Sequence, residues 1–301
     1  MDVNLLSISL ENIINDNIIK KNISLTIARL DKIHADVSGN KLFKLHYFIE
    51  ECLDSSHKTL LTFGGAFSNH LVATAFLCKQ KGIKAIGIVR GEEPKTLSHT
   101  LERCKDLGME IKYISRQDYK DFDNNKNGIE VLKNIYGDFT IVPEGGYHKT
   151  GAKGAAIIMD VIDASKYSHI CTAVGTATTL AGLLLKKQID QNIIAIPVIK
   201  KMVDIPLRLK HLGIAEDKIP VIFSDYDFGG YAKHTNELTT FMNDFYAETL
   251  IPTDFVYTAK MMFAVYDKIE KDYFANGSNI LCLHTGGLQG NKSLPLGTLS
   301  F

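Results

Sequence analysis

Several features that would point to other classes of protein are missing from this 301-residue sequence. Its 34 lysines and arginines balance 34 aspartates and glutamates, so the formal net charge is zero, and no basic block occurs. Because proteins that bind nucleic acids carry a basic surface, this class has little support. No apolar run approaches the roughly 18 residues that a transmembrane helix needs. The first residues, MDVN, lack the basic region of a signal peptide.

Cysteine is scarce, and its spacing is not that of a metal site or a disulfide framework. The five cysteines form no CxxC motif, which predicts reduced and mostly buried thiols in a cytoplasmic protein without a metal site. No predicted strand is followed by a GxGxxG motif, which argues against a dinucleotide-dependent oxidoreductase.

The sequence does contain a regular alternation of strand-like and helix-like segments. This alternation predicts an α/β fold in which parallel sheets are covered by helices on both faces, and the length allows two domains. A polar stretch at 121–128 is predicted to be a surface loop. The predicted strands are 59–63, 85–89, 110–114, 140–142, 169–174, 193–199, 221–223 and 279–284. The predicted helices are 42–52, 69–81, 97–107, 129–135, 151–162, 178–187, 234–250 and 256–271.

The octapeptide SGNKLFKL at residues 38–45 is the most informative local motif. It places Lys41 at the start of a predicted helix, directly after the flexible pair Gly39 and Asn40. Asn40 is predicted to cap this helix, because its side chain can accept from a free backbone N–H. A partly desolvated lysine loses its preference for the charged form, and the neutral amine is a nucleophile. Taken alone, the motif also fits an ordinary solvated lysine.

Three other segments end a strand-like run in small and hydroxyl-bearing residues. They are TFGGAFSNH at 62–70, AVGTATTLAG at 173–182 and LCLHTGG at 281–287. In open α/β sheets, ligands bind beyond the carboxyl ends of the strands, so these segments and the octapeptide are predicted to share one cleft. The second segment opens a helix whose free N–H groups suit a dianionic phosphate, and an N-capped helix without a ligand is the alternative.

Together these segments resemble the pyridoxal-phosphate-dependent 1-aminocyclopropane-1-carboxylate deaminases and D-cysteine desulfhydrases, and the resemblance covers nearly the whole chain in matching order. It also includes PEGG at 143–146, GGYAK at 229–233 and VYT at 256–258. The resemblance implies the two-lobed, tryptophan synthase β-like fold of type II pyridoxal-phosphate enzymes. It implies a large cofactor-binding domain from residues 1–46 and 146–301, and a small inserted α/β domain from residues 47–145. It also implies a homodimer.

The same resemblance assigns roles to individual side chains. Lys41 would form the Schiff base with pyridoxal 5′-phosphate and, once displaced, move the α-proton of the substrate. Lys44 lies about one helical turn further on and would face the same cleft, although a structural salt bridge fits equally well. Asn69 would bond the ring oxygen of the cofactor, while Ser68 and His70 would flank the substrate carboxylate. Simple capping by Ser68 or Asn69, and a solvent-facing His70, are the alternatives.

The remaining predicted site residues surround the phosphate, the pyridine ring and the reacting carbon. Relatives often have more glycine in the middle of the phosphate loop, so the side chains of Ala177 and Thr178 are expected to narrow it. Thr285 would meet the pyridine nitrogen, whereas His284 is expected to be structural. Tyr231 and Tyr257 would act near the reacting carbon, with simple packing as the alternative. The predicted phosphate loop consists of Gly175, Thr176, Ala177, Thr178 and Thr179.

The resemblance predicts a lyase or deaminase that acts on a small amino acid. β-Elimination from D-cysteine to pyruvate, ammonia and sulfide is the leading prediction, because a neutral Thr285 makes a weak electron sink that suits a substrate with a good leaving group. Ring opening of 1-aminocyclopropane-1-carboxylate to 2-oxobutanoate and ammonia is the enzymatic alternative. A non-catalytic metabolite-binding homologue is the alternative from another class. Neither nucleic acid nor membrane is an expected partner.

Overall fold

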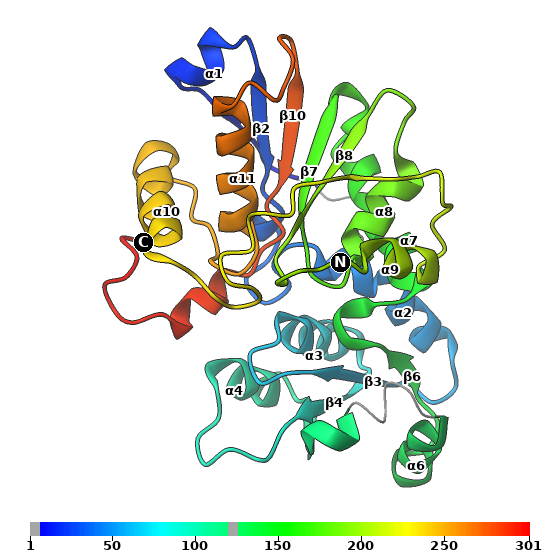
Figure 1. Ribbon diagram of the computed structural model, residues 1–301. Helices are drawn as coiled ribbons and strands as arrows, with labels where there is room; N and C mark the ends of the chain where they lie inside the picture. The colour runs from blue at the N-terminus through cyan, green and yellow to red at the C-terminus, as the bar shows by residue number, and fades with distance from the viewer. Residues whose placement is uncertain (1–6, 120–125) are drawn as a thin grey trace.

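The computed structural model describes residues 7–119 and 126–301, which form two separate β-sheets (Figure 1). The larger sheet combines strands from both ends of the chain with strands from its middle. Its edge strand β1 is antiparallel to β2, and the other neighbouring pairs are parallel. In order across the sheet, the strands are β1 (Leu10–Ile13), β2 (Ser24–Ala28), β10 (Asn279–Leu283), β7 (His169–Val174), β8 (Asn192–Pro197) and β9 (Val221–Ile222).

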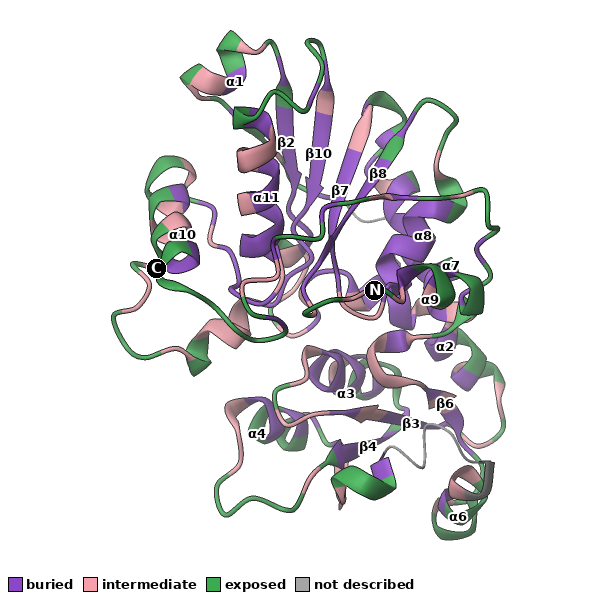
Figure 2. Ribbon diagram, in the orientation of Figure 1, coloured by how far each residue is buried: buried purple, intermediate pink, exposed green. Residues whose placement is uncertain are grey.

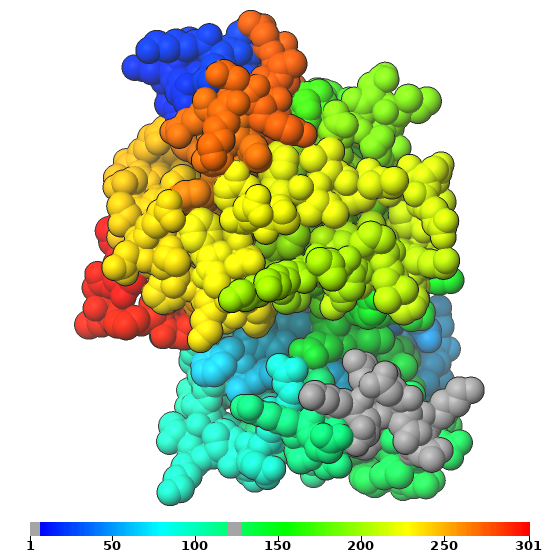
Figure 3. Space-filling model, in the orientation of Figure 1, coloured from blue at the N-terminus to red at the C-terminus, as the bar shows by residue number. Residues whose placement is uncertain are grey.

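The smaller sheet is wholly parallel and is built from one continuous part of the chain. Its strands in order are β5 (Glu110–Ile114), β4 (Lys84–Arg90), β3 (Thr59–Gly64) and β6 (Thr140–Val142). Strands 59–64 and 279–283 therefore lie in different sheets. In the space-filling view the cyan and green residues of the smaller sheet form the lower part of the visible face (Figure 3). The yellow segment that leads towards α10 lies directly above them.

Helices pack against both sheets, as the alternation of the sequence predicts. α3 begins and ends where the sequence places it, and its C-cap Gly82 has the left-handed φ of +67°. No helix among the described residues has the length and apolar character that a membrane span requires. The helices are α1 (Asp16–Lys20), α2 (Lys41–Asp54), α3 (Asn69–Lys81), α4 (His99–Asp106), α6 (Lys126–Tyr136), α7 (Lys149–Val161), α8 (Thr178–Lys186), α9 (Ile205–His211), α10 (Asn236–Thr249) and α11 (Thr258–Glu270).

Close packing of α7 against α2 and α8 brings the starts of these two helices together. A Cβ added to Gly154 of α7 would lie 2.1 Å from the Phe43 carbonyl oxygen of α2. A Cβ added to Gly182 of α8 would lie 2.6 Å from the Cβ of Ala155. Figure 2 shows the resulting layer, with buried residues continuous through β2, β10, β7 and α8. Small residues at these crossings therefore set the distance between the octapeptide and the predicted phosphate loop.

Among the described residues, the strands β1 and β2 and the α-helices α1 and α9 are elements that the sequence pattern did not reveal. The isoleucines at residues 13–27 fit both a helical and a strand period, so their pattern alone does not choose between them. Pairing with β10 decides in favour of a strand for residues 24–28. Of the predicted polar loop, residues 121–125 lie outside the described residues, and α6 begins at Lys126. The segment from Pro143 to Gly146 leads from β6 to α7.

Candidate active site

The octapeptide turn packs directly on the end of strand β10. Gly39 has φ of +79°, and a Cβ added to it would lie 1.8 Å from the Thr285 carbonyl oxygen, so only glycine fits here. The Asn40 backbone N–H donates to the same oxygen at 3.4 Å. Lys41, the first residue of α2, is therefore presented at the carboxyl edge of the larger sheet beside Thr285, which is buried.

Asn40 does not cap α2, which corrects the prediction from the sequence. Its backbone is already helical, and its side chain makes no capping hydrogen bond. Instead, Asn40 Nδ2 donates to Thr179 Oγ1 at 2.8 Å, and Asn40 Oδ1 accepts from Lys41 Nζ at 2.9 Å. A buried amide needs partners at both ends, and here the tertiary structure supplies them from another helix and from the neighbouring lysine. Asn40 thus joins Lys41 to the predicted phosphate loop.

The two lysines of the octapeptide are held in a protein environment that disfavours their charge. Burial lowers the pKa of Lys41 to about 8, although the negative charge of Asp254 partly opposes the shift. Burial, together with the charge of Lys41, lowers the pKa of Lys44 well below its ordinary value. Across residues 7–119 and 126–301, no acidic group lies within ion-pair distance of Lys44 Nζ. The described residues therefore hold no salt bridge to Lys44, and its amine lies one turn from that of Lys41, which donates to Asn40 Oδ1.

The predicted phosphate loop connects β7 to α8 and leaves its backbone donors free. Within the described parts of the chain, no backbone N–H of residues 175–179 donates a hydrogen bond. Ala177 has the left-handed φ of +67° at the N-cap of α8, which fits the glycine expected at this position in relatives. Thr176 Oγ1 and Thr178 Oγ1 lie 2.9 Å apart and share a hydrogen bond. The methyl group of Thr176 lies 3.0 Å from a Cβ added to Gly145.

The start of α3 brings a buried histidine to the same place. His70 is only 2% exposed, so the solvent-facing alternative is wrong. Its Nε2 lies 2.8 Å from Thr62 Oγ1, whereas its Nδ1 is buried without a partner among the described residues. Burial lowers the pKa of His70 to about 3, and the charges of Lys41 and Lys44 add to the shift. The imidazole is therefore neutral, with one ring nitrogen available to a ligand.

Ser68 and Asn69 precede His70 at the same helix end and are half-buried. Ser68 occupies the N-cap position of α3, but its side chain makes no capping hydrogen bond. The alternative that Ser68 only caps the helix is therefore wrong, and its hydroxyl remains available to a ligand. A Cβ added to Gly64 would lie 2.8 Å from Ser68 Oγ, so the glycine allows the hydroxyl to fold back over the strand end.

The two tyrosines of the predicted site contact each other. Tyr257 donates to the Tyr231 hydroxyl at 3.2 Å, and the two rings meet edge to face with centroids 5.9 Å apart. The Tyr257 ring also lies against Gly175, because its Cε1 would be 3.3 Å from a Cβ added there. Burial raises the pKa of both tyrosines, so both phenols stay protonated at neutral pH. Tyr257 therefore borders the predicted phosphate loop at Gly175, and Tyr231 contacts Tyr257.

Two residues near α11 belong to the site although the sequence interpretation passed over them. Asp254 is fully buried and accepts from the backbone N–H groups of residues 256, 257 and 258 at 2.9–3.0 Å and from Thr258 Oγ1 at 2.7 Å. The spacing of an aspartate four residues before a threonine is a capping signal that was present in the sequence. Lys260, also fully buried, lies one turn further along the helix.

His284, which precedes Thr285, has a structural environment, as the sequence interpretation expected. Its Nε2 donates to the Pro252 carbonyl oxygen at 2.7 Å, and its Nδ1 lies 3.2 Å from Asp31 Oδ1. The Asp31 carboxylate is itself bound by the buried Arg29 guanidinium at 2.7 Å. Because both ring nitrogens face protein atoms, His284 holds the end of β10 in place and offers nothing to a ligand.

The donor set at this edge suits pyridoxal phosphate. A row of free backbone N–H groups at a helix start and the unpaired Lys44 suit its phosphate. The unpartnered Nδ1 of His70 and the weakly basic amine of Lys41, which donates to Asn40 Oδ1, complete the site. Buried polar groups without partners are rare in folded proteins, so an unpartnered His70 Nδ1 beside free backbone N–H groups and two lysines is consistent with a ligand site.

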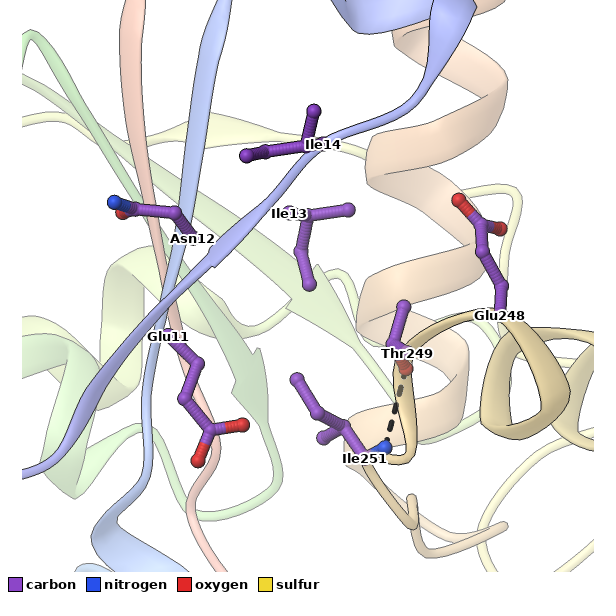
Figure 4. A pocket seen from close by; sticks show the side chains of 7 residues that line it. All are labelled: Glu11, Asn12, Ile13, Ile14, Glu248, Thr249 and Ile251. Carbon is purple, nitrogen blue, oxygen red and sulfur yellow. Dashed lines mark hydrogen bonds between the residues drawn. The ribbon is translucent and has the colours of Figure 1, made fainter.

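A separate recess of about 230 Å³ lies at the opposite edge of the larger sheet, between β1 and the end of α10 (Figure 4). It is lined by isoleucine side chains, Glu11, Asn12, Glu248 and Thr249. No lysine, arginine or histidine faces it. Because none of its lining residues carries a positive charge, this recess differs from the site around Lys41.

Comparisons with known proteins agree with this interpretation. No protein-family model matches the chain. The bifunctional D-cysteine desulfhydrase/1-aminocyclopropane-1-carboxylate deaminase of Arabidopsis thaliana is 28% identical over 299 residues, which cover 88% of this chain and 73% of that protein. The 1-aminocyclopropane-1-carboxylate deaminase of Bradyrhizobium sp. strain ORS 278 is 26% identical over 281 residues, which cover 83% of this chain and 82% of that protein.

Solved structures show the same relationship. A homologue of 1-aminocyclopropane-1-carboxylate deaminase superposes with a TM-score of 0.81 at 25% identity, covering 97% of this chain and 92% of that chain. A pyridoxal 5′-phosphate-dependent aspartate racemase superposes with a TM-score of 0.71 at 11% identity, covering 96% and 93% of the two chains, and shares the fold. These comparisons confirm the predicted family resemblance and the predicted fold class.

Proposed function

Since this chain is a homologue of pyridoxal-phosphate-dependent deaminases and lyases with the type II fold, we propose that it catalyses β-elimination from D-cysteine or a related β-substituted D-amino acid. With one water molecule, D-cysteine would give pyruvate, ammonia and hydrogen sulfide. The observation that carries the proposal is Lys41, whose amine has a pKa of about 8 and lies beside a free phosphate-binding loop.

The residues around Lys41 divide the tasks of binding and proton transfer. Pyridoxal phosphate, when bound, supplies the electron sink for the bond that breaks at the α-carbon. The N–H groups of residues 175–179 and the Lys44 amine would hold its phosphate, and Asn69 would hold its ring oxygen. Lys41 would anchor it covalently and afterwards move the α-proton, because its amine exists partly as the free base near neutral pH.

The substrate itself would lie between α3 and the two tyrosines. Ser68 would orient its carboxylate at the positive start of α3. Thr62 Oγ1 donates to the Val142 carbonyl oxygen, so His70 Nε2 donates to Thr62 Oγ1, and the free Nδ1 of the neutral ring would accept from a donor group of the ligand. The hydroxyl pair of Tyr231 and Tyr257 would face the leaving group, since both phenols remain protonated and can give a proton. A thiolate that leaves from the β-carbon would take up such a proton.

The environment of Thr285 supports elimination over racemisation. A carboxylate at the pyridine nitrogen would keep that nitrogen protonated and strengthen the electron sink, whereas the Thr285 hydroxyl does so weakly. The nearby Asp254 carboxylate is already bound by three backbone N–H groups and a threonine hydroxyl. A weak sink favours substrates with a leaving group that departs quickly.

Ring opening of 1-aminocyclopropane-1-carboxylate is the second candidate, and the names of both curated relatives favour it. This substrate has no α-proton, so its first step cannot be the proton removal assigned to Lys41. We also propose that the enzyme is a homodimer, which light scattering coupled to size-exclusion chromatography would test.

Absorbance and a substrate panel test the proposal. The purified protein is expected to absorb near 420 nm, roughly as pyridoxal-phosphate enzymes do, and to lose this absorbance with borohydride. β-Chloro-D-alanine and D-cysteine should give pyruvate rapidly, whereas D-alanine, which lacks a leaving group, should give only slow α-proton exchange. Efficient alanine racemisation without pyruvate from the chloro compound would overturn the lyase assignment. Activity on 1-aminocyclopropane-1-carboxylate alone would establish the second candidate.

A further inference from the structure

Lys260, on the first turn of α11, is a buried lysine that the proposed reaction does not use. Its side chain is 0% exposed. Its Nζ donates to the carbonyl oxygens of Asp227 and Gly230, both at 2.7 Å. Within the described part of the chain, no carboxylate lies within ion-pair distance of this ammonium. Its hydrogen-bond partners therefore belong to the backbone of a single loop.

That loop, residues 227–232, has an unfavourable backbone conformation. Phe228 and Ala232 have φ of +49° and +54°, although both carry a Cβ. Gly229 and Gly230, between them, have φ of +93° and +112°. A non-glycine residue is strained in the left-handed region, so Phe228 and Ala232 each add an unfavourable backbone conformation that the contacts of the loop must offset.

Lys260 binds the loop at the two carbonyl groups that organise it. The Asp227 carbonyl oxygen also accepts from the Gly230 backbone N–H at 2.9 Å, and the Gly230 carbonyl oxygen also accepts from the Lys233 backbone N–H at 3.1 Å. Each of these oxygens thus joins an internal loop hydrogen bond to the buried ammonium. Because a charged donor strengthens such bonds, Lys260 holds both turns of the loop at once.

The residue that follows Gly230 is Tyr231, whose hydroxyl accepts from Tyr257 at 3.2 Å. Tyr257 is the N-cap residue of α11, and Lys260 lies three residues further along the same helix. The start of α11 therefore carries Tyr257 directly, and through Lys260 it binds the loop that carries Tyr231. Tyr231 is 55% exposed, and its ring meets that of Tyr257 edge to face.

We propose that Lys260 is a positioning residue, which clamps loop 227–232 so that the Tyr231 hydroxyl meets Tyr257 at the active site. The clamp itself is a structural statement that holds with or without an enzymatic role. Its consequence for catalysis rests on the proposed function, which assigns the two phenols to the leaving group.

Hydrogen–deuterium exchange of the purified protein, followed by mass spectrometry, tests the clamp. Lys260→Met and Lys260→Gln are compared with wild type and with Lys271→Met, which removes an exposed lysine at the other end of the same helix. We expect peptides that cover residues 227–233 to exchange at least tenfold faster in Lys260→Met, because the Gly230 and Lys233 amides lose their support. Lys260→Gln keeps a hydrogen-bond donor, so its exchange rate should lie between those of wild type and Lys260→Met. This variant also allows the test if Lys260→Met fails to fold.

The control Lys271→Met should leave the exchange of residues 227–233 unchanged. Unchanged exchange in both Lys260 variants would overturn the clamp, whatever reaction the protein catalyses. Faster exchange throughout the chain would also overturn it, because that result would show a general loss of stability in place of a local one.

A double-mutant cycle tests the consequence for catalysis with β-chloro-D-alanine. Tyr231→Phe and Lys260→Gln should each lower kcat by about 10–100-fold with less than a threefold change in KM. If Lys260 acts through Tyr231, adding Lys260→Gln to Tyr231→Phe should lower kcat by less than a further twofold. Multiplicative losses would overturn the positioning role while leaving the exchange result intact. Failure of wild type to process the compound would count against the proposed function and not against the clamp.

Discussion

Two regions of this protein bury lysines in opposite ways. At the start of α2, Lys41 has one amide oxygen as its partner, and Lys44 has neither a hydrogen-bond acceptor nor an acidic partner among the described residues. At the start of α11, Lys260 is fully buried, and its ammonium donates to two backbone carbonyls at 2.7 Å. Burial lowers the pKa of Lys41 and of Lys260 to about 8.

The difference shows that a lowered pKa alone does not identify a reactive lysine. Desolvation acts on all three amines, because burial disfavours the charged form wherever it occurs. The two regions differ in how many hydrogen-bond acceptors the protein offers to each lysine amine. An amine with its donors engaged stabilises the fold, whereas an amine left without partners is available to a ligand.

The largest expected effect is the loss of turnover when Lys41 is removed. Lys41→Ala should lower kcat by at least about 10³-fold, because it removes the covalent anchor and the proton carrier. Borohydride reduction followed by peptide mapping should attach a pyridoxyl group to the peptide that contains Lys41. Lys81→Ala, an exposed lysine at the end of α3, is the matched control and should keep full activity. A label on another lysine would contradict the assignment.

Lys260→Met is expected to destabilise the protein. The substitution removes two hydrogen bonds from a buried donor and leaves each carbonyl oxygen with its loop N–H alone, so the free energy of unfolding should fall by about 1–3 kcal/mol. Urea unfolding of the cofactor-free protein measures this change. If Lys260→Met were as stable as wild type or more stable, the hydrogen bonds of Lys260 would not stabilise the fold, and the α2 and α11 regions would not differ in this respect.

Lys44→Met is expected to stabilise the cofactor-free protein, whereas Lys260→Met destabilises it. The folded-state pKa of Lys44 is lowered, so the unfolded state binds more protons and the charged lysine opposes folding at neutral pH. Methionine should raise the free energy of unfolding by about 1–2 kcal/mol at pH 7. This gain should shrink as the pH rises towards 10.5, the ordinary lysine pKa, where wild type no longer carries the charge.

Urea unfolding at pH 7, 8.5 and 10 would measure this dependence, and Lys44→Met should also weaken the retention of pyridoxal phosphate. A gain that grows with pH would contradict the direction of the shift. No gain at any pH would mean that Lys44 has partners in solution and that the α2 region resembles the α11 region.

The smallest expected effect concerns Ala177 in the phosphate loop. Its φ of +67° is unfavourable for a residue with a Cβ, so Ala177→Gly should raise the free energy of unfolding by up to about 1 kcal/mol. Ala181→Gly, in the middle of α8, is the control and should lower it by about 1 kcal/mol. A loss of stability in Ala177→Gly would show that the Cβ packs well enough to offset the strain.

Local patterns were sufficient for much of the fold. The bounds of α3, β5, β6 and β7 agree with the sequence prediction, because each has a clear period and clear stop signals such as Gly82. The strands β1 and β2 escaped prediction, since isoleucines spaced for either period do not reveal which neighbour they will meet. Pairing across more than 250 residues, from Ser24 to Asn279, decided that part.

The sequence by itself determined which chemistry this protein carries: a lysine after a glycine turn, a hydroxyl-rich loop before a helix, and a threonine at the end of the last core strand. These features are local, so short segments specify them. Only the tertiary structure decided which polar groups keep partners. It turned Asn40 from a cap into a link to Thr179, left Lys44 and His70 Nδ1 without partners, and bound Lys260 to a distant loop. Hydrogen-bond satisfaction depends on atoms far apart in the chain, and for that reason it cannot be read from the residues in order.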